Sequence, residues 1–118
     1  MKLSEIIKIL DAEVPFCEDK HLELEILGAG AADLMDDVLA AAAKNGVILT
    51  GQVSVEVVQF CNMAKAVAIV FVRGKKSDSE IIDVAKKYEI PILLTKYSLF
   101  VACGRLYMNG LRGLDGSW

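Results

Sequence analysis

The chain has 118 residues, of which 54% are apolar, 25% charged and 7% aromatic, which suits one folded domain. This apolar content excludes an intrinsically disordered chain, and the net charge of −3 provides no positive field for binding nucleic acid. No apolar run reaches the roughly 20 residues of a membrane span, and the first residues do not open a signal peptide, so we expect a cytoplasmic protein without membrane contact.

The first part of the chain predicts a helix and two strands. Residues 3–10 repeat apolar side chains at the spacing of one helical stripe. Pro15 limits this helix, and residues 14–17 suit a short strand. Residues 22–27 alternate apolar and acidic side chains, which is typical of a strand buried on one side.

A connection made of small residues is expected at 28–32. Asp33 can then cap a helix that extends to about Lys44. Asn45 and Gly46 end that helix, because both residues tolerate the left-handed conformation of a helix C-terminus.

Three units of strand, loop and helix follow. The strands are expected at residues 47–50, 66–72 and 91–95. Each is followed by a serine that can cap a helix, namely Ser54, Ser77 within the capping box Ser-Asp-Ser-Glu, and Ser98. The first of these helices runs to about Met63 and the last to about Asn109. Strands separated by single helices predict an α/β fold, in which a parallel sheet lies between helices.

One sequence motif is similar to the end of a phosphate-binding loop. It reads Gly74-Lys-Lys-Ser77, but Ile69 stands where the first glycine of that loop is required, and Lys76 occupies the hydroxyl position. The motif therefore favours a solvated loop that ends in a helix cap, and it does not predict a kinase.

A degenerate dinucleotide fingerprint occurs at Gly28-Ala-Gly-Ala-Ala-Asp33. The acidic residues Asp33, Asp36 and Asp37 would repel a pyrophosphate at a helix N-terminus, whereas they complement the positive end of the helix dipole. A divalent ion held by these carboxylates would make an enzyme, which we rank last among the functions considered.

The cysteines and the single histidine do not predict a metal, a cofactor or a catalytic triad. Cys17 and His21 are close in sequence, but no paired short spacing of ligands is present. Cys61 and Cys103 lie in expected helices and suit small buried residues. His21 lies beside acidic residues and is expected in a surface loop. We therefore expect no catalytic residues, no metal and no cofactor.

Ligands of open parallel sheets bind beyond the carboxyl ends of the strands. The three loops expected at this edge carry hydroxyls, an amide, an aromatic ring and cations. The candidate ligand-binding residues are Thr50, Gln52, Ser54, Arg73, Thr95 and Tyr97. They suit a small anion, a nucleotide or an acidic segment of a partner. The alternative is that the serines only cap helices and the lysines are solvated.

A small domain with this apolar content is expected to bury part of its surface against another molecule. The candidate surface for a homodimer is formed by the helices at 54–63 and 98–109. Its candidate residues are Val57, Phe60, Phe100 and Tyr107.

Several short sequence motifs occur along the chain in an order that is found in a known domain family. They are Ala32-Asp-Leu-Met-Asp-Asp37-Val-Leu, Thr50-Gly-Gln52, the strand at 66–72, Gly74, Ile90-Pro-Ile-Leu-Leu-Thr95, and Phe100 followed by Gly104-Arg-Leu-Tyr107. In this arrangement the chain resembles the DRTGG domain family. Residues 1–118 look like a single stand-alone member, with a core at about 33–107 and a glycine-rich tail at 110–118 that is frayed or docked onto a neighbour.

The resemblance implies a three-layer α/β/α sandwich with a mainly parallel sheet, usually paired as a homodimer. Such domains also occur beside CBS domains in pyrophosphatases and within phosphotransacetylases. They are similar to the N-terminal domain of HPr kinase/phosphorylase, whose kinase chemistry resides in a separate domain. Small members are labelled as HPr serine kinase-like or as hydrogenase-associated, so the implied partner is a redox or kinase-related protein.

Two functions follow from these patterns. The first is a non-catalytic regulatory or assembly module that works as a homodimer. The alternative is a sensor that binds an adenine nucleotide or another anion at the strand-end loops.

Overall fold

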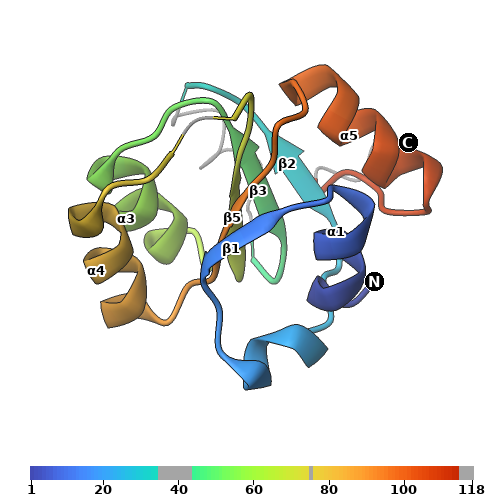
Figure 1. Cartoon of the computed structure of the whole chain (residues 1–118). Helices are drawn as coiled ribbons and strands as arrows, with labels where there is room; N and C mark the ends of the chain where they lie inside the picture. Colours follow the sequence, from blue (N-terminus) through green and yellow to red (C-terminus); the bar gives the residue numbers. More distant parts are fainter. Residues whose placement is uncertain (35–43, 75, 115–118) are drawn as a thin grey trace.

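A five-stranded sheet in the order β1-β5-β4-β3-β2 forms the centre of the molecule (Figure 1). The computed structural model describes residues 1–34, 44–74 and 76–114. The strands are β1 (Glu13–Phe16), β2 (Ala29–Ala31), β3 (Val47–Thr50), β4 (Ala68–Phe71) and β5 (Ile92–Leu94). The last four are parallel to one another, whereas β1 runs antiparallel beside β5. The prediction of a mainly parallel sheet is therefore confirmed.

Helices cover both faces of this sheet (Figure 1). α3 (Val55–Met63) and α4 (Ser79–Tyr88) pack on one face. α1 (Leu3–Ile9) and α5 (Leu99–Met108) pack on the other. The fold is thus the expected three-layer α/β/α sandwich, and its radius of gyration is 12.3 Å.

The central strands supply both hydrophobic cores. Every residue of β3 and β4 is buried. Successive side chains of a strand point to opposite faces. Ile48 and Ile69 therefore join the core under α3 and α4, whereas Leu49 and Val70 join the core under α1 and α5. A strand with two covered faces is therefore mostly apolar, as the sequence between residues 66 and 72 indicates.

Two of the three expected serine caps are present. Ser54 Oγ accepts a hydrogen bond from the backbone N–H of Val57 at 3.3 Å, and α3 begins there. Ser98 Oγ accepts from the N–H of Val101 at 3.2 Å at the start of α5. Both side chains satisfy helix donors that otherwise have no partner within the helix.

The third expected cap is wrong by one residue. The carboxylate of Asp78, not the hydroxyl of Ser77, accepts from the N–H of Ile81 at 3.0 Å, and α4 begins at Ser79. A negatively charged acceptor also complements the helix dipole, which a hydroxyl does not. Ser77 Oγ is buried and has no hydrogen-bond partner within the described part of the chain.

The segment at 22–27 is not the expected strand. A short 3₁₀ helix occupies Asp19–Glu23, and the residues after it pair with the beginning of the chain. The backbone N–H of Leu3 donates to the carbonyl of Leu24, and that of Ile26 donates to the carbonyl of Met1. The alternation of apolar and acidic side chains in this segment does correspond to burial, because Ile26 is buried whereas Glu25 is exposed. An extended segment against α1 satisfies that pattern as well as a strand does.

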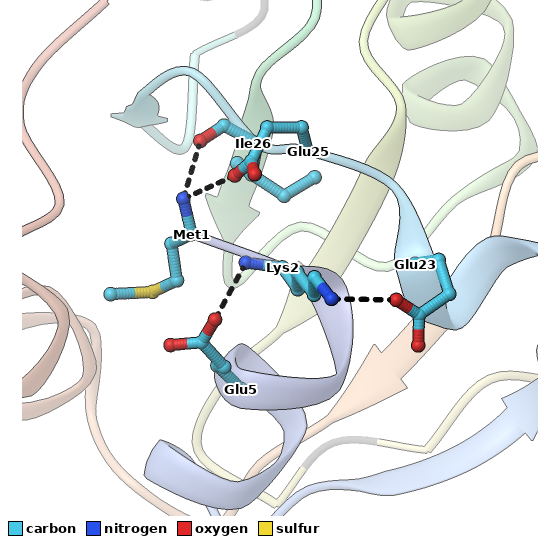
Figure 2. Close-up of polar contacts among 6 residues, drawn as sticks. All are labelled: Met1, Lys2, Glu5, Glu23, Glu25 and Ile26. Atoms are coloured by element: carbon cyan, nitrogen blue, oxygen red, sulfur yellow. Dashed lines mark hydrogen bonds and ion pairs between the residues drawn. The ribbon is translucent and has the colours of Figure 1, made fainter.

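Figure 2 shows the polar contacts that hold this segment against the start of the chain. The amino-terminal ammonium of Met1 lies 2.6 Å from Glu25 Oε2, and Lys2 Nζ lies 2.8 Å from Glu23 Oε2. The hydrogen bond from the ammonium, followed by its charge, lowers the pKa of Glu25. All three charged side chains are largely exposed, so each pair contributes little to stability in water.

The small residues expected as a connection form the edge strand β2. The chain after α5 packs on this strand: the N–H of Ala29 donates to the carbonyl of Arg112, and that of Leu114 donates to the carbonyl of Ala29. A Cβ atom at Gly28 would lie 3.0 Å from the Arg112 carbonyl oxygen. Small residues are needed here because a second backbone approaches closely.

The tail is therefore docked onto its own domain up to Leu114. The expected helix after Asp33, with Asp36 and Asp37, lies almost wholly outside the described residues, as does the end of the tail beyond residue 114.

Replacement of Asp78 by alanine is expected to lower the free energy of unfolding by about 1 kcal/mol, because one donor of α4 loses its acceptor. Urea denaturation measures this loss. Replacement of Ser77 by alanine is the matched control and should change stability by less than about 0.5 kcal/mol. A larger effect at Ser77 than at Asp78 would contradict the assigned cap.

Replacement of Glu25 by glutamine is expected to reduce stability slightly at neutral pH. A carboxyl group whose pKa is lowered by folding stabilises the protein above its unfolded pKa, and this contribution is lost as the pH falls through the folded pKa. The difference from the parent protein should therefore vanish well below about pH 4.3, the ordinary glutamate value. Denaturation midpoints measured from pH 7 downward test this. Glu13→Gln, at a side chain without an ion pair in the described residues, should show no such trend.

Candidate functional site

The loops after β3, β4 and β5 meet at one edge of the sheet, as expected. Their backbones are joined directly: the N–H of Arg73 donates to the carbonyl of Tyr97 at 2.7 Å, and that of Gly74 donates to the carbonyl of Thr95 at 2.9 Å. Arg73 adopts a left-handed backbone conformation, with φ of 64°. The structure thus brings the candidate ligand residues of the three loops to a common edge.

The Thr50 hydroxyl at this edge is buried and serves the loop that follows β3. It accepts from the N–H of Gln52 at 3.1 Å and donates to Asp33 Oδ1 at 3.5 Å. The same carboxylate oxygen accepts from the N–H of Gly51 at 2.7 Å. Asp33 therefore holds the loop that follows β3, a contact that its sequence neighbours do not indicate.

Gly51 is needed where the loops come together. A Cβ atom at this position would overlap the guanidinium of Arg73 and lie 3.2 Å from Asp33 Oδ1. Without a side chain on Gly51, the guanidinium can lie against the backbone beside the Asp33 carboxylate. This arrangement fixes one cation at the edge.

Thr95 joins the edge to the opposite end of the sequence. Its side-chain hydroxyl donates to the carbonyl of Leu10 at 2.8 Å and accepts from the N–H of Tyr97 at 3.3 Å. The residue is 1% exposed. Thr95 is therefore a tether between the end of α1 and the loop after β5.

The six candidate ligand residues thus divide into two groups. The hydroxyls of Thr50, Ser54 and Thr95 are occupied by backbone groups of this chain. Gln52 and Arg73 are exposed, and Tyr97 is half-buried. A ligand at this edge would be reached by the second group, and that role stays a prediction.

An arginine that was not among the candidate ligand residues lies on Tyr97. The guanidinium carbon of Arg105, on α5, is 4.4 Å from the centre of the Tyr97 ring. A cation over an aromatic face is attracted by the negative face of the ring. The pair is brought together by the start of α5, and the seven positions between the two residues carry no pattern that indicates it.

A cavity of about 390 Å³ opens beside these loops. One wall is the turn between α1 and β1, and the others are the loops after β4 and β5. Its charged lining residues are Asp11, Glu13, Lys76 and Lys96. No local pattern in the sequence indicates the first wall, because only the antiparallel pairing of β1 with β5, in which Glu13 lies opposite Leu94, brings it to this edge.

The four candidate dimer residues do not form one surface. Val57 is fully buried in the core beneath α3, so it is not available for contact with another molecule. α3 and α5 also lie on opposite faces of the sheet (Figure 1). Phe100 and Tyr107 of α5 are 86% and 46% exposed, whereas Phe60 packs partly against the core. The apolar content of the whole chain predicts excess apolar surface, but it does not indicate the face on which that surface lies.

The cysteines are structural in character. Burial raises the pKa of Cys61 to about 12, and burial also raises the pKa of Cys17 and of Cys103. At neutral pH such thiols are protonated, and the thiol is not the nucleophilic form.

The single histidine is not in the expected surface loop. His21 is only 4% exposed, its Nδ1 accepts from the N–H of Glu18 at 3.0 Å, and its ring lies edge-on to Phe16. Among the described residues, no group of three or more potential metal ligands is assembled.

No helix in the described part of the chain has the length and apolar content needed to cross a membrane. Neither a family model nor a curated protein matches the chain.

A solved structure does share the fold. The chain is similar to the CBS and DRTGG domains of the regulatory region of Clostridium perfringens pyrophosphatase, crystallised with its activator diadenosine tetraphosphate. The TM-score is 0.76 at 18% identity, and the match covers 97% of this chain and 48% of that chain. The chain therefore spans about half the length of that protein fragment. The likeness supports the DRTGG-like fold, and the fragment belongs to a regulatory rather than a catalytic region.

Replacement of Thr95 by valine is expected to lower the free energy of unfolding by about 1–3 kcal/mol, because the buried Leu10 carbonyl loses its donor. Thermal or urea denaturation measures the loss. Thr95→Ser keeps the hydroxyl and should retain most of the stability. A larger loss in Thr95→Ser than in Thr95→Val would show that packing of the methyl group, not the tether, is what matters.

Proposed function

We propose that the chain is a non-catalytic regulatory or assembly domain that works as a homodimer. The observation that carries the proposal is an exposed, mainly apolar surface on α5, which we call the α5 face. Its residues are Phe100, Val101, Gly104, Tyr107 and Met108. Phe100 is 86% and Met108 87% exposed. Single exposed apolar residues are normal on proteins, but a contiguous group of them is typical of an interaction site.

The residues at the strand-end edge of the sheet and the cysteines support a non-catalytic role. The buried hydroxyls of Thr50 and Thr95 are committed to backbone groups, and the thiols have raised pKa values. The likeness to a regulatory region of a pyrophosphatase favours the same reading. The DRTGG resemblance suggests a redox or serine-kinase-related protein as the system that such a dimer would serve.

Light scattering on the purified chain tests the proposal. Across the micromolar range we expect a mass of about twice the 12.8 kDa of the chain. The reason is that burial of the α5 face against a second copy removes large apolar side chains from water. A monomer throughout this range would contradict the homodimer.

A second candidate function is an anion sensor, most simply for an adenine nucleotide. The observation that favours it is the cavity beside the strand-end loops, whose volume falls within the range of small-molecule sites. The ring of Tyr97 could stack on a base, while Lys76 and Lys96 could contact phosphates. The structurally similar pyrophosphatase fragment was crystallised with diadenosine tetraphosphate.

Calorimetry with AMP, ATP and diadenosine tetraphosphate tests this second candidate. If one of them binds, Lys96→Gln should weaken binding by about tenfold, because one charged contact to phosphate is lost. Lys65→Gln is the matched control, since Lys65 lies outside this cavity and lines another hollow with His21 and Glu89. The absence of heat with every nucleotide, or equal weakening by both variants, would contradict the sensor.

A further inference from the structure

We infer that α5 packs antiparallel against α5 of a second copy, across a two-fold axis that passes beside Gly104. This inference rests on the proposed homodimer and identifies the contact that forms it. Three features of the helix support it: the position of the glycine, the empty space around it, and the arrangement of apolar residues on either side.

Gly104 lies at the centre of the solvent-facing side of α5. Ala102 and Leu106 are the fully buried residues of this helix. Because each residue turns an α-helix by about 100°, Gly104 points away from both of them. The position that faces outward most directly is thus the one without a side chain.

Packing within the chain does not require this glycine. A Cβ atom at Gly104 would have no atom within 4 Å, its own helix backbone apart, among the described residues. Its φ is not positive, so the backbone conformation does not require glycine either. Glycine destabilises a helix interior relative to alanine. A close approach by the backbone of another molecule accounts for a glycine here, because a Cβ would hold that backbone away.

The apolar residues of the α5 face are arranged symmetrically about Gly104. Phe100 and Met108 are four positions before and after it, and Val101 and Tyr107 are three positions before and after it. In an antiparallel pair related by a two-fold axis at Gly104, each residue meets the one at the opposite offset. Phe100 would then contact Met108 of the partner subunit, which is a favourable pairing of a ring and a sulfur atom.

The charges of α5 are compatible with self-association. Arg105 is the only charged residue of the helix, and its guanidinium lies over the Tyr97 ring, so like charges do not meet at the axis. Arg112, which follows the helix, lies with its guanidinium carbon 4.2 Å from the centre of the Tyr107 ring and so borders the α5 face. Apolar residues at matching offsets make the α5 face complementary to itself in the antiparallel orientation. A second copy is therefore the occupant that the pattern fits.

Cysteine cross-linking tests the contact. In a Cys17→Ser, Cys103→Ser background, Gly104→Cys should form a disulfide between copies under mild oxidation, since two-fold-related residues beside the axis come within bonding reach. Asn62→Cys, at an exposed position of α3, is the matched control and should remain uncrosslinked at the same protein concentration. The remaining Cys61 is buried and its pKa of about 12 keeps it unreactive.

A second variant separates folding from association. Gly104→Leu has open space around it and a better helix former, so the thermal midpoint of the monomer should not fall. The leucine would force the two helices apart, and we expect the dissociation constant of the dimer to rise at least about tenfold. Circular dichroism and light scattering measure the two effects.

The outcomes distinguish this inference from the proposal beneath it. A monomeric parent protein would overturn both. A dimer that does not cross-link through Gly104→Cys and tolerates Gly104→Leu would overturn the α5 contact and leave the homodimer standing. Cross-linking together with loss of the dimer in Gly104→Leu is the expected result.

Discussion

The burial of β3 and β4 on both faces is the constraint on which the rest of the structure depends. An apolar strand in the middle of a parallel sheet needs a helix layer on each side, and the chain supplies α3 and α4 for one face and α1 and α5 for the other. Each helix packs one side against the core. What remains for function is the edge where the strands end and the outer sides of the helices (Figure 1).

At the strand-end edge, hydroxyl groups that the sequence offers as ligand contacts are already hydrogen-bonded within the chain. A buried hydroxyl requires a hydrogen-bond partner, and Thr50 and Thr95 find theirs in the backbone of neighbouring loops. Arg73 is exposed and Tyr97 is half-buried, so both can be reached from solvent. The edge is thus a hydrogen-bonded frame with exposed side chains and an adjacent cavity.

The outer side of α5 differs from that of α4. The exposed positions of α4 carry Asp83, Lys86 and Lys87, as expected for a solvated helix. Those of α5 carry Phe100, Val101, Tyr107 and Met108, although both helices bury a similar inner stripe. This difference between the outer sides of two helices is the main physical ground for the proposal that the domain associates with a second copy.

The sequence by itself determined the three-layer α/β class, the three central parallel strands and the serine caps of α3 and α5, because periodicity and capping are local properties. The tertiary structure decided which extended segments join the sheet: β2 at 29–31 pairs with β3, whereas residues 22–27 lie on α1. It also decided that β1 runs antiparallel to β5 and so completes the cavity, and that α3 and α5 face opposite ways. These features depend on partners distant in the sequence, and no local pattern specifies which partner a strand or helix face meets.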